Sequence, residues 1–179
     1  MKKFIVLLRG INVSGHKKIN MKELKSYFEG LGFYKVATYI QSGNVIFMSK
    51  ISDKLKLQKI IEKMIFDKYN FDVKTIIITS KELVKILEQN PFKDKYEQEE
   101  NKLYFTFLFD KVTDENLAKL NSMNFDSEYF SFKENIIYLY VPNGYGRAKL
   151  NNNFIEKKLK VDATTRNLKT VRKLIELSE

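Results

Sequence analysis

The sequence contains no cysteine and only one histidine, His16. Without cysteine the chain has no disulfide, no thiol nucleophile and no cysteine-ligated zinc. A single histidine would leave a zinc site dependent on carboxylates, so we expect no metal and no cofactor. The absence of cysteine is also typical of proteins that work in a reducing compartment.

Long hydrophobic runs are missing as well. No stretch approaches the roughly 18 apolar residues that a membrane-spanning helix needs. The first residues, Met1–Lys3 followed by the apolar run Phe4–Leu8, are similar to the start of a signal peptide. Arg9 interrupts that run before the ~7–15 apolar residues of a signal core. We therefore expect a cytoplasmic protein with no membrane partner.

Arginine is scarce although the chain is basic. The net charge is +10, with 32 basic residues, and such lysine-rich chains are typical of AT-rich genomes. The placement of the charge is more informative than its total. Residues 1–50 carry nine basic and two acidic side chains, residues 151–179 carry seven and four, and the middle of the chain is balanced. This layout indicates an anionic partner for the two ends of the sequence.

The few guanidinium groups support the same interpretation. A guanidinium binds carboxylate or phosphate through two parallel hydrogen bonds, which lysine cannot do. Each arginine could instead pair with a structural carboxylate. The arginines are Arg9, Arg147, Arg166 and Arg172.

Apolar periodicity predicts alternating strands and helices in the first half of the chain. Met21–Leu31 has helical spacing, and Asn20 before it is a typical N-cap. Thr79 and Glu82 predict a capping box at a later helix. The expected elements are strand 3–9, helix 21–31, strand 36–40, strand 45–48, helix 53–69, strand 71–78 and a helix ending at Asn90.

The same order begins again after residues 92–101, a mostly charged segment that we interpret as a solvated linker. The expected elements are strand 103–109, helix 114–123, strands 129–132 and 136–141, helix 150–159, a short strand 161–163 and a last helix 166–177. The order βαββαβ thus occurs twice. We predict an α+β fold of two ferredoxin-like subdomains, 1–90 and 102–179, the second irregular and carrying an extra C-terminal helix.

The loop after the first strand is the main candidate site. In a βαββαβ sheet the first two strands run in the same direction, so this loop and the turn at 41–44 should lie at one sheet edge. Glycines, backbone N–H groups and basic side chains there indicate a site for phosphate or carboxylate. The predicted ligand-binding residues at this edge are Arg9, Gly10, Asn12, Gly15, Lys17, Ser42, Gly43 and Asn44.

These residues also allow structural interpretations. The sequence Ser42-Gly43-Asn44 is typical of a hairpin turn that requires a positive φ. His16 is either a surface residue of the loop or a weak candidate for acid–base catalysis.

A second basic segment, Pro142–Lys149, contains two glycines with Arg147 and Lys149. It does not match the Gly-x-x-x-x-Gly-Lys-Ser/Thr pattern of a P-loop. Tyr145 within it is the other weak catalytic candidate.

A third segment, Thr164–Asn167, is typical of a helix start. Thr164 and Thr165 would cap the helix, and Arg166 and Asn167 would lie in its first turn. The predicted ligand-binding set is completed by Arg147, Lys149, Arg166 and Asn167.

Three segments, Arg9–Val13 with Gly15, Tyr39–Val45 and Ala163–Asn167, resemble in the same order the motifs of the bacterial "domain of unknown function 1697" family. The resemblance implies two related α/β subdomains in a cytosolic protein, and no established activity. The positions that resemble the family pattern are Arg9, Gly10, Asn12, Gly15, Tyr39, Ser42, Gly43, Asn44, Lys149, Thr165, Arg166 and Asn167.

The chain departs from that pattern at three positions. Ser14 stands where the family has glycine, Ala148 where it has serine, and Leu168 where it has tryptophan. Ala148 disfavours a hydroxyl nucleophile in its loop, and Leu168 disfavours a stacking indole.

Three functional hypotheses follow. The first is binding of a phosphate-bearing ligand, a nucleotide or single-stranded nucleic acid, although the signature of the RNA-recognition motif is absent. The second is a small enzyme that holds an anionic metabolite with Arg9, Arg147 and Arg166. The third is a protein-interaction or oligomeric scaffold without a small-molecule site, and the oligomeric state is left open.

Overall fold

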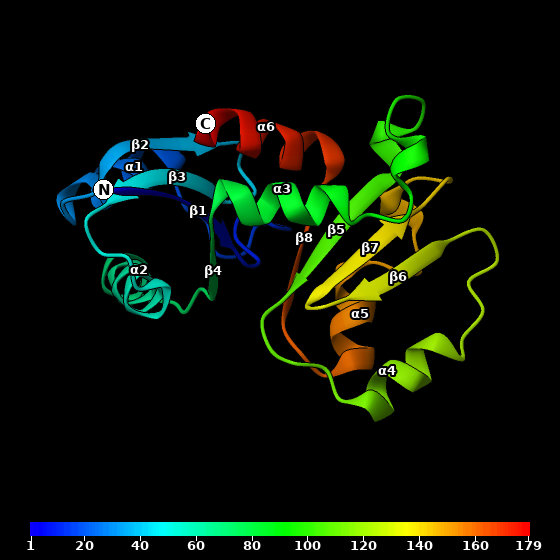
Figure 1. The fold of residues 1–179 in the computed structure, drawn as a ribbon. Helices are drawn as coiled ribbons and strands as arrows, with labels where there is room; N and C mark the ends of the chain where they lie inside the picture. The colour runs from blue at the N-terminus through cyan, green and yellow to red at the C-terminus, as the bar shows by residue number, and fades with distance from the viewer. The chain divides into compact units, whose positions relative to one another are not determined.

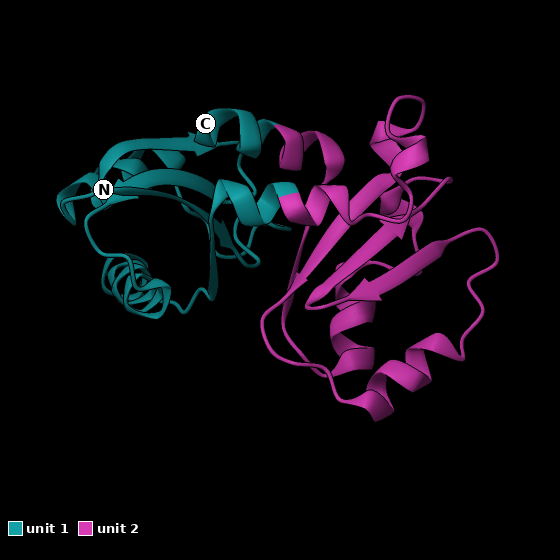
Figure 2. Cartoon of the chain, viewed as in Figure 1, with its two compact units in different colours: residues 1–84, 173–179 teal, residues 85–172 magenta.

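The computed structural model describes all 179 residues. The chain divides into two compact units (Figure 2). Unit 1 comprises Met1–Val84 and Lys173–Glu179, and unit 2 comprises Lys85–Arg172. The fold is α+β, with two four-stranded antiparallel sheets and six α-helices (Figure 1). None of the helices combines the length and the apolar character that crossing a bilayer requires.

Unit 1 contains the first sheet. Its elements are β1 (Lys2–Leu8), α1 (Met21–Gly30), β2 (Tyr34–Tyr39), β3 (Asn44–Ser49), α2 (Lys54–Tyr69) and β4 (Thr75–Ile78). The strand order is β2-β3-β1-β4, and every pair is antiparallel. Because β3 lies between β1 and β2, those two strands run in the same direction. Helix α3 (Ser80–Glu88) then begins in unit 1 and ends in unit 2.

Unit 2 contains the second sheet, with order β6-β7-β5-β8 and antiparallel pairs throughout. Its elements are the 3₁₀ turns η1 (Lys93–Lys95) and η2 (Glu100–Lys102), β5 (Leu103–Leu108), α4 (Asp114–Asn121), β6 (Tyr129–Lys133), β7 (Ile136–Tyr140), η3 (Tyr145–Arg147), α5 (Asn152–Leu159) and β8 (Ala163–Asn167). Helix α6 (Leu168–Ser178) begins in unit 2, and its last residues belong to unit 1.

Side-chain caps define the starts of α1 and α3. The Asn20 side chain accepts the N–H groups of Lys22 and Glu23 at 2.9 and 3.3 Å. Thr79 and Glu82 form a reciprocal pair, with Thr79 N–H donating to the carboxylate at 2.8 Å and Glu82 N–H to the hydroxyl at 3.3 Å. Both predicted helix starts are confirmed, because each cap satisfies N–H groups that have no partner within the helix.

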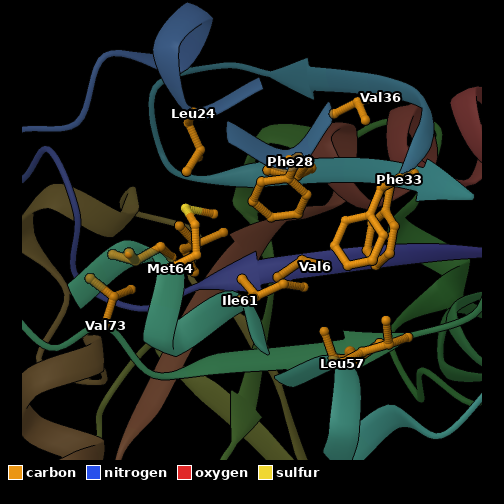
Figure 3. Close-up of a cluster of buried hydrophobic side chains, with 14 of the residues drawn as sticks. Val6, Leu24, Phe28, Phe33, Val36, Leu57, Ile61, Met64 and Val73 are labelled. Atoms are coloured by element: carbon orange, nitrogen blue, oxygen red, sulfur yellow. The ribbon is translucent and has the colours of Figure 1, made fainter. Parts of the chain in front are cut away.

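The core of unit 1 lies between the sheet and helices α1 and α2. Side chains from β1, α1 and α2, including Val6, Leu24, Phe28 and Ile61, point toward one another there (Figure 3). Phe47 contributes ring contacts to Phe28, at a centroid distance of 5.6 Å. Full burial of each such side chain stabilises the fold by about 1.5–3 kcal/mol.

The core of unit 2 is built in the same way, from β5, β7, α4 and α5. Leu108 and Ile137 on the sheet are fully or almost fully buried with Leu120 on α4 and Ile155 on α5. Each sheet therefore buries one face against two helices of its own unit.

The two units repeat a set of hydrogen bonds at corresponding strand ends. At the end of β1, the N–H groups of Leu8 and Arg9 donate to Gly43 and Lys74 carbonyls at 2.9 and 3.0 Å; at the end of β5, those of Leu108 and Phe109 donate to Asn135 and Asp162 at 3.0 and 2.9 Å. The first residue of the last strand in each unit, β4 or β8, also donates its N–H to a glutamate on the preceding helix, α2 or α5. Thr75 bonds to Glu62 and Ala163 to Glu156, both at 2.7 Å.

The expectation for residues 161–167 is wrong. Ala163–Asn167 forms β8, not a short strand at 161–163 followed by a helix from residue 166. Thr164 and Thr165 are strand residues rather than caps, because their β-branched side chains favour extended backbone and β5 pairs along all of β8. The cap of α6 is Asn167, whose side chain accepts Thr170 N–H at 2.8 Å.

Two smaller differences concern segment limits. Strand β4 begins at Thr75 rather than at residue 71. The charged segment 92–101, which was expected to be a linker, contains the 3₁₀ turn η1 and the start of η2.

Candidate functional site

The basic loop, residues 9–20, has an unusual backbone. Five of the eight residues from Gly10 to Lys17 have a positive φ: Gly10 (64°), Asn12 (54°), Ser14 (49°), Gly15 (78°) and Lys17 (44°). Only glycine adopts this region without strain, so surrounding contacts must hold the three other residues there.

Asn12 supplies much of that support. Its side-chain oxygen accepts Ile19 N–H at 2.9 Å, while its amide donates to the carbonyls of Ile19 and Gln41 at 3.0 and 2.9 Å. Its main-chain N–H donates to Lys17 at 3.2 Å. The side chain thus closes the loop and joins it to the turn at 41–44, which confirms that these segments meet at one sheet edge.

Two buried isoleucines anchor the loop to the core. Ile11 is 1% exposed and Ile19 is 3% exposed. The segment between them is therefore anchored to the core at both ends.

The turn at 41–44 is shaped by Gly43 and Asn44. Gly43 is buried with φ 80°, and a Cβ there would lie 2.8 Å from the Leu8 Cβ and from the Ile11 side chain. Asn44 is fully buried, and its amide donates to the Tyr39 carbonyl at 2.9 Å and the Ser42 hydroxyl at 3.1 Å. These contacts support the hairpin-turn interpretation of Ser42-Gly43-Asn44.

The exposed part of the loop is its tip. Ser14, Gly15, His16 and Lys18 are all exposed, and His16 N–H closes the tip by donating to Val13 at 2.9 Å. The N–H groups of Ser14 and Gly15 have no acceptor within the protein. Ser14 and Gly15 have consecutive positive φ values and are the two central residues of a turn closed by the Val13–His16 hydrogen bond. N–H groups exposed in such a turn can hold an anion.

The other two predicted cationic residues of this edge, Arg9 and Lys17, contact the segment before β4. The Lys17 ammonium donates to the Asp72 carbonyl and lies 6.0 Å from the centre of the Phe71 ring. Arg9 is half-buried, and its main-chain N–H donates to Lys74. The sequence-based set omitted Ser14 and Lys18, which are both exposed at the tip. An exposed main-chain N–H such as that of Ser14 cannot be recognised from the side-chain type.

The Pro142–Lys149 segment holds a carboxylate of the protein itself. Gly144 has φ 87°, and η3 follows it. The N–H groups of Lys149 and Leu150 donate to the Glu128 carboxylate at 2.8 and 2.7 Å. These two donors are therefore occupied, and the exposed side chains of Arg147 and Lys149 are the cationic groups that the segment offers to solvent.

Tyr145 has a structural environment. Its hydroxyl accepts the N–H of Asn152 at the start of α5 at 2.8 Å, and its ring stacks on Tyr104 at 4.4 Å. Burial raises the pKa of Tyr145 above its ordinary value, so the hydroxyl stays protonated at neutral pH. A raised pKa does not suit a catalytic base.

Arg166 is an interior residue of β8, only 5% exposed. Its guanidinium donates to the Thr164 hydroxyl at 2.7 Å and the Thr165 carbonyl at 3.0 Å. Burial lowers the pKa of Arg166 to about 10, which still leaves it charged at neutral pH. The expectation that Arg166 and Asn167 lie in the first turn of a helix is therefore wrong, because β8 extends to Asn167.

Potential metal ligands are not clustered anywhere in the chain. No group of three or more histidine, aspartate or glutamate side chains is placed to bind a metal ion.

A family model described as "Protein of unknown function (DUF1697)" matches residues 1–138, about three quarters of the chain. The chain belongs to this family. A structure titled as that of conserved bacterial protein SP0830 from Streptococcus pneumoniae is similar to it, with 25% identity, a TM-score of 0.78, and coverage of 99% of this chain and 98% of that one. No curated protein matches the sequence.

The DUF1697 match includes the basic loop and the turn at 41–44 but ends before Pro142. Within the matched region, the positions that resemble the family pattern divide into two groups. Asn12, Gly43 and Asn44 form internal contacts, whereas Gly10 and Gly15 are exposed. The first group maintains the shape of the sheet edge, and the second lies where a ligand has access.

Proposed function

We propose that this cytosolic DUF1697 protein binds a phosphate-bearing ligand, a nucleotide or single-stranded nucleic acid, at the tip of the basic loop. The observation that supports this best is the backbone of residues 10–17, with five positive φ values. A non-glycine residue in this region costs roughly 1–3 kcal/mol, and strain of this kind clusters at binding sites.

The chemistry of the tip suits phosphate. Ser14 and Gly15 present N–H donors, and the exposed side chains of His16 and Lys18 flank them. The surrounding first fifty residues carry nine basic and two acidic side chains, which favours a negative ligand at this edge.

The test is a thermal-shift series with inorganic phosphate, nucleotides and short oligonucleotides at about 50 and 200 mM salt. Wild type is compared with Lys18→Ala and with Lys59→Ala, which removes the same charge from an exposed site on α2. We expect a stabilising shift that Lys18→Ala reduces at least by half and Lys59→Ala leaves unchanged. The absence of a shift with every probe, or equal losses in the two variants, would overturn the proposal.

Salt dependence separates the two kinds of ligand. An oligonucleotide that contacts several phosphates loses affinity steeply as salt rises, whereas a mononucleotide loses it gradually. The slope therefore identifies the ligand class independently of the variants.

A second candidate, a protein-interaction scaffold, is favoured by one observation. Asn12, Ser42 and Asn44 direct their side-chain hydrogen bonds into the protein. If the edge serves only the fold, Lys18→Ala will bind every probe as wild type does, and only variants of the internal residues will change the protein, by lowering its stability.

We also infer that the chain has two ferredoxin-like subdomains, 1–90 and 102–179, which contain the sheets of units 1 and 2. The last residues of the second subdomain, Lys173–Glu179, belong to compact unit 1. The strand orders β2-β3-β1-β4 and β6-β7-β5-β8 and the repeated strand-end hydrogen bonds support this inference. Hydrogen exchange tests these boundaries. If they are correct, the amides of each sheet will exchange as a separate cooperative group.

A further inference from the structure

An aromatic hollow lies at one end of the unit 2 sheet, beside the first residue of the Pro142–Lys149 segment. Its volume is about 360 Å³, near the lower limit of ligand pockets. Such a volume suits one planar ring system with a substituent better than a large ligand. The lining residues are Phe92, Lys95, Ser127, Tyr129, Tyr140 and Pro142.

The two tyrosines come from neighbouring strands. Tyr129 begins β6 and is paired directly with Tyr140 at the end of β7, so their side chains project from the same face of the sheet. Their rings are nearly parallel, with centroids 5.7 Å apart and an interplanar angle of 19°. Tyr129 is 50% exposed whereas Tyr140 is 9% exposed. Tyr129 therefore offers the accessible ring face.

Tyr140 is held in place from several sides. Its hydroxyl lies 2.8 Å from both oxygens of the Glu99 carboxylate, to which it donates, and its ring lies 6.1 Å from that of Phe92. The hydrogen bond to Glu99, together with burial, raises the pKa of Tyr140 to about 12. The hydroxyl therefore stays protonated. Because these contacts already hold the Tyr140 ring, ligand binding at Tyr129 carries no entropic cost for ordering it.

Lys95 gives the hollow a cation. Its ammonium lies 5.0 Å from the centre of the Tyr140 ring. Asp94 lies 3.8 Å away but is 71% exposed, and such an exposed pair is weak. The Glu99 carboxylate, which accepts the Tyr140 hydroxyl, also interacts with Lys95 and partly offsets its charge. Lys95 is the cationic side chain among the residues that line the hollow, so a negative group on a bound ring gains attraction where it approaches the ammonium.

The corresponding position in unit 1 lacks this arrangement. Tyr34 begins β2 as Tyr129 begins β6, but its partner on β3 is Met48 instead of a tyrosine. Tyr34 is 47% exposed, close to the value for Tyr129. It therefore serves as a matched control for an exposed edge-strand tyrosine outside the hollow.

We propose that the hollow of Phe92, Lys95, Tyr129 and Tyr140 binds the base of a nucleotide or of a single-stranded nucleic acid, stacked on Tyr129 with its phosphate near Lys95. The ligand class rests on the function proposed above, but the site is separate from the basic loop. Stacking on an aromatic side chain tolerates any base, because every base has a planar face.

The test compares a short oligothymidine with an abasic strand of equal length, by fluorescence anisotropy, and adenosine with adenosine monophosphate, by NMR. We expect Tyr129→Leu to weaken oligothymidine binding about tenfold and to leave abasic-strand binding unchanged. Tyr34→Leu should change neither. Both substitutions are at exposed sites, and equal melting temperatures would confirm that the variants fold.

The arms of the experiment separate this inference from the proposed function. Base binding that depends on Tyr129 but not on Lys18 supports the hollow even if the loop tip binds no phosphate. If the mononucleotide binds as tightly as the oligonucleotide, the site is one for free nucleotides. If the oligonucleotide binds more tightly, the site is one for a nucleic-acid strand.

Three outcomes would overturn the inference. The first is equal affinity of wild type for oligothymidine and the abasic strand. The second is equal loss in Tyr129→Leu and Tyr34→Leu. The third is that neither nucleoside, nucleotide nor oligomer perturbs the NMR signals of the Tyr129 ring.

Discussion

At the residue scale, single side chains at the basic edge join segments that are distant in the sequence. Asn12 contacts Gln41, which is 29 positions away in the sequence. Because Gly43 has no side chain, Leu8 and Ile11 pack directly against its Cα. Neither relationship can be read from composition. The sequence predicted that the loop and the turn meet, but not that Asn12 is the residue that connects them, because side-chain partners depend on the final packing.

Asn12→Ala should destabilise the protein by about 2–3 kcal/mol. The substitution removes three side-chain hydrogen bonds and leaves the N–H of the buried Ile19 without an acceptor. Urea unfolding followed by circular dichroism measures the change. Asn153→Ala, at an exposed site on α5, is the control and should be nearly neutral. Equal effects of the two substitutions would contradict the joining role of Asn12.

Gly43→Ala should cost more than about 2 kcal/mol. Its φ of 80° strains any L side chain, and the new Cβ would lie 2.8 Å from two core side chains. Gly146→Ala is the control, because Gly146 has no positive φ and a Cβ there meets nothing within 4 Å. Thermal melts of both variants decide the point, and a mild effect at Gly43 would show that the turn can rearrange.

At the element scale, local signals predicted helix starts better than strand ends. Asn20 and Thr79 act within three residues of their own positions, so their motifs could be recognised in the sequence. β8 could not be recognised, since Thr164–Asn167 is equally typical of a helix cap, and its pairing with β5 joins residues about sixty positions apart. The distant partner, and not the local propensity, decides its conformation.

The start of α3 should make stability depend on acid. Partial burial raises the pKa of Glu82, but hydrogen bonds from Lys54 and Thr79 outweigh it, so the pKa lies below its ordinary value of 4.5. A lowered pKa contributes stability that is complete above 4.5 and is lost as pH falls through the folded-state value.

Glu82→Gln should therefore be less stable than wild type at neutral pH, with a difference that shrinks toward about pH 3. Urea unfolding over this pH range measures it. Glu88→Gln, which removes an exposed carboxylate from the end of the same helix, is the control for the loss of one negative charge. A gap for Glu82→Gln that stays constant with pH would rule out the capping carboxylate as its source.

At the scale of the whole molecule, two units of similar construction differ in detail. The strand-end hydrogen bonds occur in both units although the residues around them differ. Glu62 in unit 1 and Glu156 in unit 2 likewise occupy equivalent positions. The repeated order of elements could be predicted because apolar periodicity survives such divergence. The aromatic hollow could not, because Phe92 and Lys95 reach the sheet end from a segment that composition suggested was a solvated linker.

A chain that ends at Arg172 should lose stability mainly in unit 1. It lacks Leu174 and Ile175, which are 0% and 9% exposed and belong to that unit, and each buried side chain of this size contributes about 1.5–3 kcal/mol. Hydrogen exchange should show earlier exposure of the β1 amides than of the β7 amides. Removal of the exposed Glu179 alone is the control, and uniform loss of protection across both sheets would argue against this assignment.

The discontinuity of unit 1 has a consequence for biosynthesis. A ribosome produces Met1–Val84 first, then all of unit 2, and only then Lys173–Glu179. Unit 2 emerges as one uninterrupted segment and can pack its sheet at once. Unit 1, although most of it is made earlier, must wait for the end of α6, whose buried Leu174 and Ile175 belong to it. The half of the protein that leaves the exit tunnel first is the half that is finished last, and during that interval it is the half most in need of a chaperone.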